Sequence, residues 1–158
     1  MSKDIWYFAY GSNLSVDQKE ERTGVVRKAL LCRLPGYRLA FNKKGRDGTA
    51  RANIMEAGPE EVWGVAYLCD ETAMTRMDKD EGVPGGHYRR QRVEVITASG
   101  HMRLDAIAYV AGEEFIFPEG EPSCEYLARI LEGARKHGLP SHYIEQIDLL
   151  AHRHDSSC

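Results

Sequence analysis

The chain is organised around IWYFAYGSNL, the stretch that spans residues 5–14. Trp, Tyr, Phe and Ile favour the pleated, half-buried surface of a β-sheet, so this stretch predicts a strand. The strand is expected to stop at Gly-Ser-Asn, because Gly tolerates a positive φ while Ser and Asn bond to nearby backbone. Ser15 or Asn13 is then expected to cap a short helix over residues 16–22.

A strand that runs through such a turn into a helix exposes several backbone N–H groups at one point. These groups can hold a carboxylate or a developing oxyanion. The turn lacks the GxxxxGK[ST] and GxGxxG patterns, so it does not predict a nucleotide site. On the residues alone, a tight strand–helix connection is the simpler interpretation and an anion site is the alternative.

The rest of the chain predicts more strands, followed by helices. Strands are predicted over residues 27–41, with a bend or turn at Pro35-Gly36, and over 62–68, 88–97 and 104–111. Residues 51–55 form a short apolar patch that ends at Gly58-Pro59. Asp70, Ser123 and Ser141 are predicted N-caps of three helices. This order indicates an α+β protein with a largely antiparallel or mixed sheet. Several strands with Gly and Pro bends suggest a closed, barrel-like sheet.

Bulk properties narrow the class of protein. The 158 residues predict one domain over 1–158, and a net charge of −3 with scattered Lys and Arg predicts no nucleic-acid partner. No apolar run approaches the roughly 20 residues that span a bilayer, and no signal-peptide core follows the start. We therefore expect a cytoplasmic protein without a membrane partner.

The cysteines and histidines predict no disulfide framework and no metal site. The four cysteines are far apart in sequence, with buried thiols expected at Cys32, Cys69 and Cys124 and an exposed one at Cys158. His152 and His154 have no evident partner and are expected in a solvated tail. With no metal-ligand spacing anywhere, we expect a protein that uses neither metal nor cofactor.

Glu81 is the candidate acid/base residue. It ends a predicted helix and precedes Gly82-Val83-Pro84-Gly85-Gly86, a loop that can carry it into a cleft. A carboxylate among apolar neighbours has a raised pKa, which makes it usable as a base near neutral pH. The alternative is that Glu81 lies with Asp78 and Asp80 on a solvated helix end. An acidic helix C-terminus is unfavourable, and broken local rules of this kind sometimes mark functional sites.

Other catalytic arrangements find less support. Ser12 lacks the GxSxG pattern of a nucleophile elbow. His87 and His101 have no evident nucleophile to activate. Tyr10, Tyr109 and Tyr126 fit either a pocket wall or a core.

Four ordered blocks of sequence resemble the γ-glutamylcyclotransferase family. They are YFAYGSNL (7–14), EVWGV (61–65), MDKDEGV (77–83) with Tyr88 after it, and a closing segment with Pro122-Ser123, Tyr126, Gly133-Ala134, Gly138-Leu139-Pro140 and Tyr143. The resemblance runs in order from about residue 7 to residue 150. It implies a mixed, mostly antiparallel β-barrel flanked by helices, which is often a homodimer.

The resemblance also implies an activity and a site. The activity is cyclisation of a γ-glutamyl amino acid to 5-oxoproline with release of the amino acid, a reaction of glutathione metabolism. Glu81 would be the general acid/base. The substrate-binding residues would be Tyr7, Phe8, Ala9, Tyr10, Gly11, Ser12, Asn13 and Tyr126. Two departures, Asn53 where many relatives have Thr and the doubled Gly85-Gly86, leave the leaving group open, including whether intact glutathione is accepted.

Two other functions fit the same sequence. One is a γ-glutamylamine cyclotransferase, which would need no cation for a second carboxylate on the leaving group. The other is a non-catalytic small-molecule sensor or interaction module that kept the barrel. The YGSN turn and Glu81 argue against the second.

Overall fold

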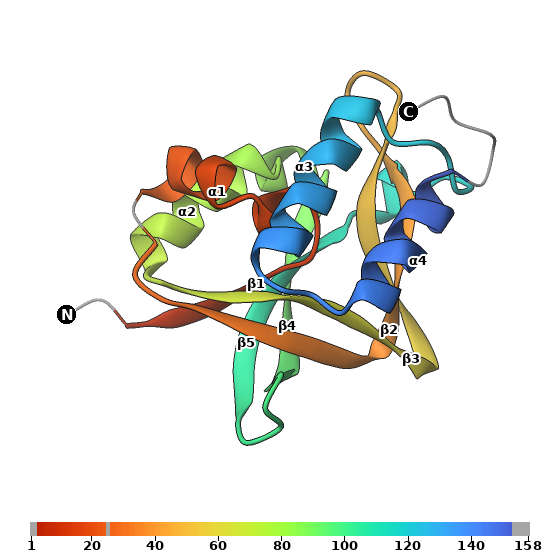
Figure 1. Cartoon of the computed structure of the whole chain (residues 1–158). Coiled ribbons are helices and arrows are strands. Elements are labelled where there is room, and N and C mark those ends of the chain that lie inside the picture. The colour runs from red at the N-terminus through yellow and green to blue at the C-terminus, as the bar shows by residue number, and fades with distance from the viewer. Residues whose placement is uncertain (1–2, 25, 153–158) are drawn as a thin grey trace.

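The computed structural model describes residues 3–24 and 26–152 of the chain. In this part, the strands close into one barrel in the order β1-β3-β2-β4-β5 (Figure 1). Their bounds are β1 (Ile5–Ala9), β2 (Ala29–Lys44), β3 (Ala50–Cys69), β4 (Tyr88–Thr97) and β5 (Arg103–Ala111). β1 pairs with β5 in parallel and every other pairing is antiparallel. The predicted mixed, mostly antiparallel barrel of an α+β protein is therefore confirmed.

The β2–β3 hairpin corrects two predicted strand breaks. β2 runs on through Pro35, and the register with β3 shifts between Pro35 and Tyr37. β3 likewise continues through Gly58 and Pro59, where the chain is exposed. Proline is tolerated at bulges and sheet edges, where its missing N–H disrupts little. The two strands are thus longer than the sequence predicted, and their far end projects as a hairpin over the barrel mouth.

Helices follow the predicted caps with one exception. They are α1 (Val16–Thr23), α2 (Glu71–Asp80), α3 (Cys124–Lys136) and α4 (Ser141–Ala151), with short 3-10 turns η1 (Ser12–Leu14), η2 (Val83–Gly85) and η3 (Glu113–Phe115). Ser15, Asp70 and Ser123 each accept a hydrogen bond from a backbone N–H of the first turn. Ser141 does not cap α4, because Pro140 holds that position.

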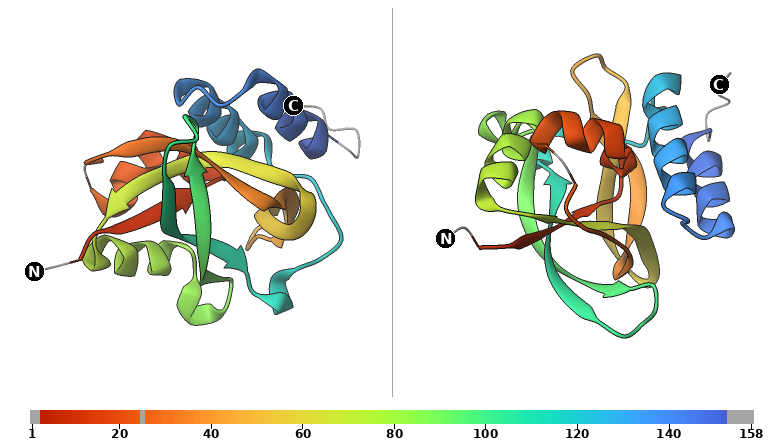
Figure 2. Two further views of the ribbon diagram at one scale, coloured as in Figure 1. Left: turned by 90° about the horizontal axis from the view of Figure 1, so that it is seen from below. Right: turned by 60° about the vertical axis from the view of Figure 1, so that its left-hand side comes forward.

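Two helix pairs flank the barrel. α1 contacts α2 on one side, and α3 contacts α4 on the other (Figures 1 and 2). Gly133 lets α3 lie directly on the η1 turn, since a Cβ there would stand 2.4 Å from the carbonyl carbon of Leu14. This close approach brings the first turn of the chain and the third helix together at the barrel mouth.

The cysteines and the C-terminal histidines differ in part from expectation. Cys32 and Cys69 are buried free thiols, as predicted. Cys124, at the start of α3, is exposed and disulfide-bonded, so the buried free thiol predicted there is wrong. His152 forms a 3.3 Å contact with Asp148, whereas His154 and Cys158 lie outside the described residues. None of the described helices is long and apolar enough to cross a bilayer.

Candidate active site

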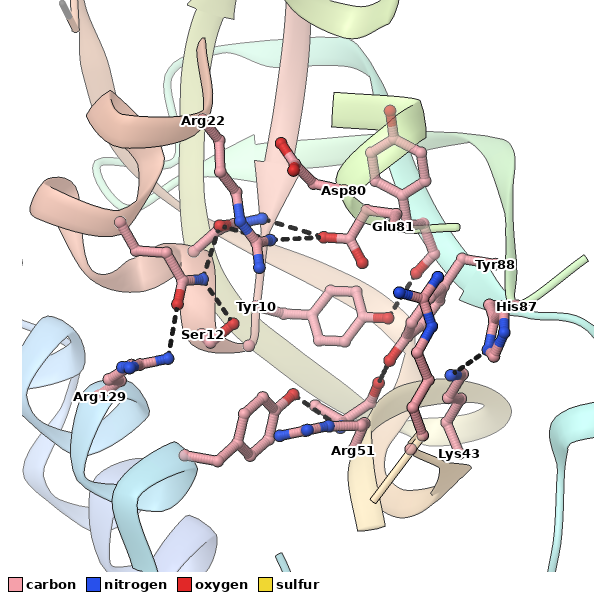
Figure 3. A pocket seen from close by; sticks show the side chains of 18 of the residues that line it. Tyr10, Ser12, Arg22, Lys43, Arg51, Asp80, Glu81, His87, Tyr88 and Arg129 are labelled. Carbon is pink, nitrogen blue, oxygen red and sulfur yellow. Dashed lines mark hydrogen bonds and ion pairs between the residues drawn. The ribbon is translucent and has the colours of Figure 1, made fainter. Parts of the chain in front are cut away.

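A cavity of about 260 Å³ opens at the barrel mouth. Its walls come from the end of β1 with the following turn, from α1, from the β2–β3 hairpin, from the end of α2 with the start of β4, and from α3 (Figure 3). It therefore joins segments from the beginning, middle and end of the chain. Tyr10 lies near its centre, with Glu81 on one side and Arg51 on another.

Glu81 is fixed at the end of α2. Its N–H donates to the carbonyl of Met77 at 2.8 Å, and Gly82 then turns the chain away with a φ of 68°. Only glycine adopts that left-handed conformation readily. The Glu81 side chain, which is 16% exposed, accepts hydrogen bonds on Oε1 from Asn13 Nδ2 at 3.1 Å and from Arg22 Nη1 at 3.3 Å. No hydrogen bond from the described residues reaches Oε2, so this oxygen is available to a ligand.

The surroundings of Glu81 raise its pKa above the ordinary value. Burial is the largest cause, because it disfavours the charged carboxylate. The Arg22 guanidinium and the Asn13 amide act in the opposite direction by stabilising the charge. The result is a carboxylate that is better able to take up a proton near neutral pH than an exposed one.

Asn13 is the hub of a buried hydrogen-bond network. Besides Glu81, its Nδ2 contacts the Tyr7 hydroxyl at 2.8 Å. Its Oδ1 accepts from Gln18 Nε2 at 2.9 Å and from Arg22 Nη1 at 3.2 Å. Asn13 is only 3% exposed, and the Tyr67 hydroxyl donates to its backbone carbonyl at 2.9 Å. These contacts hold the amide in the orientation that meets Glu81.

The residues of the turn after β1 line the cavity, and the backbone N–H groups of Gly11, Ser12 and Asn13 have no acceptor within the described residues. The Ser12 hydroxyl accepts from Gln18 Nε2 at 2.7 Å, which ties the turn to α1. Gly11 has a φ of −115°, so the expected positive φ is wrong. Glycine is needed there for space, since a Cβ would lie 3.2 Å from the Ala52 Cβ and 3.4 Å from the Tyr126 hydroxyl.

Tyrosine rings form the inner wall. Tyr10 donates to the carbonyl of Tyr109, Tyr88 donates to the carbonyl of Ala52 at 2.7 Å, and Tyr126 accepts from the Ala52 N–H at 2.9 Å. Burial raises the pKa of Tyr126 to about 12, and it also raises the pKa values of Tyr10 and Tyr88 well above the ordinary value. They are therefore neutral phenols at physiological pH.

Asp78 and Asp80, the two aspartates close to Glu81 in the sequence, lie in different places. Asp78 turns away from the cavity, where it accepts from the Tyr109 hydroxyl at 2.6 Å and pairs with Arg90 at 2.9 Å. Asp80 lines the cavity beside Glu81. The alternative of three acids on a solvated helix end therefore does not describe this site.

Cations outnumber acids in the cavity wall. The basic residues there are Arg22, Lys43, Arg46, Arg51 and Arg129, against Asp80 and Glu81. These cations come from α1, the β2–β3 hairpin and α3, and nothing in the local sequence of any one of them indicates a site. In the described part of the chain, no group of three or more His, Cys, Asp or Glu side chains could hold a metal ion.

Most of the residues expected to bind substrate meet in this cavity. Tyr7, Tyr10, Gly11, Ser12, Asn13 and Tyr126 line it together with Glu81. Phe8 and Ala9 do not, and the expectation for them is corrected. They are 0% and 1% exposed and pack in the core.

The two departures from the family pattern lie outside the inner wall. Asn53 is 1% exposed and bonds to Asn42 and to the Ala111 N–H. Asn53 thus links strands of the barrel by hydrogen bonds and does not line the cavity. Gly85 ends the short turn η2, and Gly86 follows with a φ of 79°.

Comparison with known proteins places this geometry in a family. The model of the AIG2-like family matches residues 61–147. A γ-glutamylcyclotransferase of Homo sapiens is 30% identical over 146 residues, which cover 89% of this chain and 76% of that protein. The chain belongs to the γ-glutamylcyclotransferase family.

Further relatives agree with this membership. A γ-glutamylcyclotransferase of Bos taurus is 31% identical over 147 residues and matches 90% of this chain and 76% of its own length. A solved structure named γ-glutamyl cyclotransferase superposes with a TM-score of 0.81 at 27% identity, covering 92% of this chain and 87% of that one. The cyclotransferase family therefore shares both the sequence and the barrel described here.

Proposed function

We propose that this protein is a γ-glutamylcyclotransferase that converts a γ-glutamyl amino acid into 5-oxoproline and a free amino acid. One observation supports it above the others. Glu81, a carboxylate with a raised pKa, lines the same cavity as Gly11, Ser12 and Asn13, whose backbone N–H groups have no acceptor among the described residues. Membership of the family agrees with this arrangement.

The reaction needs little from the protein because the substrate carries its own nucleophile. The α-amine attacks the γ-carbonyl carbon of the same glutamyl unit, a C–N bond forms, and a five-membered ring closes. The C–N bond to the leaving amine then breaks. Since nucleophile and electrophile are tethered, holding the glutamyl unit in a curled conformation removes much of the entropic barrier.

Glu81 carries out the proton transfers in this scheme. Its Oε2 takes a proton from the α-ammonium and returns one to the departing amine. Asn13 and Arg22 hold the other oxygen, so the carboxylate keeps its orientation through both steps.

The turn after β1 would stabilise the negative charge that develops on the γ-carbonyl oxygen of the substrate. Fixed N–H donors stabilise an oxyanion strongly because they need no rearrangement during the reaction. The three N–H groups of residues 11–13 suit this role, and Gly11 keeps the approach to them open. Arg129, which also holds Gln18 at 3.3 Å, and Arg22 are the nearby cations for the substrate α-carboxylate.

The excess of cations favours an amino acid over a simple amine as the leaving group. A leaving amino acid carries its own carboxylate, which needs a positive partner beyond Glu81. The β2–β3 hairpin supplies Lys43, Arg46 and Arg51 to the cavity wall. With a γ-glutamylamine bound, Lys43 and Arg46 would have no carboxylate partner among the described residues, and Arg51 would keep only its exposed pair with Asp47.

Mass spectrometry tests the proposal directly. The protein is incubated with γ-glutamyl-alanine, glutathione and a γ-glutamyl-alkylamine, and release of 5-oxoproline is followed. We expect 5-oxoproline from γ-glutamyl-alanine and none above background from the Glu81→Gln variant. Turnover of the alkylamine alone would support the γ-glutamylamine cyclotransferase instead. Binding without 5-oxoproline from any compound would support a non-catalytic module.

A further inference from the structure

Two like charges face each other at the end of the β2–β3 hairpin. Lys43 of β2 is the register partner of Arg51 of β3, and both side chains line the cavity. Directly opposed residues of an antiparallel pair project on the same face, and like charges there are destabilising. Arg46, in the turn that joins the strands, adds a third cation to the same wall. A like-charge pair kept at such a position, with a third cation beside it, is a broken local rule of the kind found at functional sites.

Lys43 is buried without a counter-ion. It is 4% exposed, and no described carboxylate lies within ion-pair distance of its Nζ. Its contacts are His87 Nδ1 at 2.8 Å and the rings of Tyr88 and Phe115, each 5.2 Å from Nζ. Buried charges are normally paired, because desolvation of an unpaired charge is costly. Lys43 therefore lacks an anion that a ligand can supply.

Neither of the two arginines has a buried carboxylate partner among the described residues. Arg51 stacks on the ring of Tyr126 at 4.7 Å, and its only ion pair among the described residues is an exposed one with Asp47 at 3.4 Å. Arg46 is exposed and has no ion pair in the described part of the chain. Stacking on an aromatic ring orients a guanidinium while leaving its N–H donors free.

These cations lie apart from the proton-transfer residues. Figure 3 shows Arg22, Asp80 and Glu81 on one side of the Tyr10 ring, with Lys43 and Arg51 on another. A substrate whose glutamyl unit lies against Glu81 and the turn after β1 would direct its leaving group toward the hairpin.

We propose that Lys43, Arg46 and Arg51 form a subsite for an anionic leaving group, so that the protein prefers γ-glutamyl compounds whose released amino acid has an acidic side chain. The inference rests on the proposed function and specifies its substrate class. Any leaving amino acid brings one carboxylate to this subsite. Glutamate or aspartate brings two, which match the cluster of three cations better than a neutral residue does.

The test compares two substrates that differ in one charge. The specificity constant kcat/KM is measured at pH 7 for γ-glutamyl-glutamate and for γ-glutamyl-glutamine, which is nearly isosteric. One charge-assisted hydrogen bond changes binding by about tenfold or more, and we expect a preference for the glutamate compound of that size. Lys43→Met and Arg51→Gln should each lower turnover of γ-glutamyl-glutamate by about tenfold while changing that of γ-glutamyl-glutamine much less.

Controls separate a subsite from a general effect of charge. Arg92→Gln removes one exposed cation of β4 that does not line the cavity, and it should leave the preference unchanged. A preference ratio near one in the unmodified protein would overturn the inference. An unchanged ratio in both Lys43→Met and Arg51→Gln would overturn it as well.

A binding measurement keeps the inference separate from the proposed reaction. Calorimetric titration of the Glu81→Gln variant with the same two compounds should give a dissociation constant about tenfold lower for γ-glutamyl-glutamate. If no compound yields 5-oxoproline, the proposed function fails, and this titration still decides on the subsite. Equal dissociation constants for the two compounds would overturn it.

Discussion

Glu81 Oε1 accepts a 3.1 Å hydrogen bond from Asn13 Nδ2, across 68 positions of sequence. Asn13 is itself fixed by Gln18 and Tyr67, so the carboxylate is held by a group that has little freedom to move. The contact joins the end of α2 to the turn after β1. It places the candidate acid/base next to the candidate oxyanion donors in one cavity.

Replacing Glu81 with Gln should abolish cyclisation. The amide is nearly isosteric and accepts from Asn13 and Arg22 through its oxygen, but it cannot take up a proton. We expect kcat to fall by about 10² to 10⁴, the usual contribution of a positioned acid/base. The measurement is the initial rate of 5-oxoproline release. Asp105→Asn removes an exposed carboxylate of β5 and is the matched control, with activity near that of the unmodified protein.

The same substitution should stabilise the fold at neutral pH. The pKa of Glu81 is raised in the folded chain, so between pH 4.5 and that higher pKa the folded state binds more protons than the unfolded state. Stability therefore falls as pH rises through this window, and Gln removes the loss. Thermal unfolding should give a higher Tm for Glu81→Gln than for the unmodified protein at pH 7.5. The difference should shrink toward pH 4.5, and a Tm below that of the unmodified protein at pH 7.5 would contradict the assignment.

Arg22 should set the acid limb of the pH–rate profile. Glu81 acts as a base only when ionised, so kcat/KM should fall as the pH drops through its pKa, which lies above the ordinary value. The Arg22 guanidinium lowers this pKa, and Arg22→Gln should therefore move the acid limb to higher pH. Arg22→Lys keeps the positive charge and should move it less. An acid limb at the same pH in all three proteins would assign the titrating group to another residue.

Gly11→Ala should weaken substrate binding by crowding the turn. A Cβ at this position would lie 3.2 Å from the Ala52 Cβ and 3.4 Å from the Tyr126 hydroxyl, both in the cavity wall. We expect KM to rise by about tenfold, in line with the cost of overpacking, and Gly11→Val to have a larger effect. Gly58→Ala is the control, because a Cβ there meets nothing within 4 Å. Equal KM values for the Gly11 and Gly58 variants would show that the turn tolerates the added atom.

Lys43→Met should stabilise the protein while harming its specificity. Burial, with Arg51 and Arg46 nearby, lowers the pKa of Lys43 from 10.5 to about 8. The unfolded state thus binds more protons between these values, and stability of the unmodified protein should rise with pH from about 8 to 10.5. At pH 7 we expect Lys43→Met to gain on the order of 1 to 3 kcal/mol in the free energy of unfolding. Urea unfolding at pH 7 and pH 10 measures both effects, and the variant should lack the rise.

Much of the fold followed from local patterns. The strand over residues 5–9 and the caps at Ser15, Asp70 and Ser123 were predicted, because propensity and capping act over a few residues. The closed barrel was expected chiefly from the family resemblance. The breaks expected at Pro35-Gly36 and Gly58-Pro59 were wrong. There, pairing with a long neighbouring strand outweighs the local preference of Pro and Gly.

Part of the site was also predicted, because some of its residues belong to local patterns of the sequence. Glu81 was found because an acidic residue is unfavourable at the C-terminal end of a helix. The turn of residues 11–13 was found because Gly, Ser and Asn are all typical turn residues. Phe8 was misplaced, since strand alternation sends Tyr7 and Phe8 to opposite faces. The cations of the cavity wall were not found, because no sequence spacing connects Lys43 and Arg51 with Arg22 and Arg129.

The sequence by itself determined most of the strands, three of the four helix caps, the turn chemistry of residues 11–13 and the presence of an acid at position 81. Only the tertiary structure decided that Asn13 holds this acid and that three cations of the β2–β3 hairpin line the same cavity. The reason is physical: propensities and caps arise between neighbours along the chain. A cavity arises where closing the barrel brings distant segments within a few ångströms of one another.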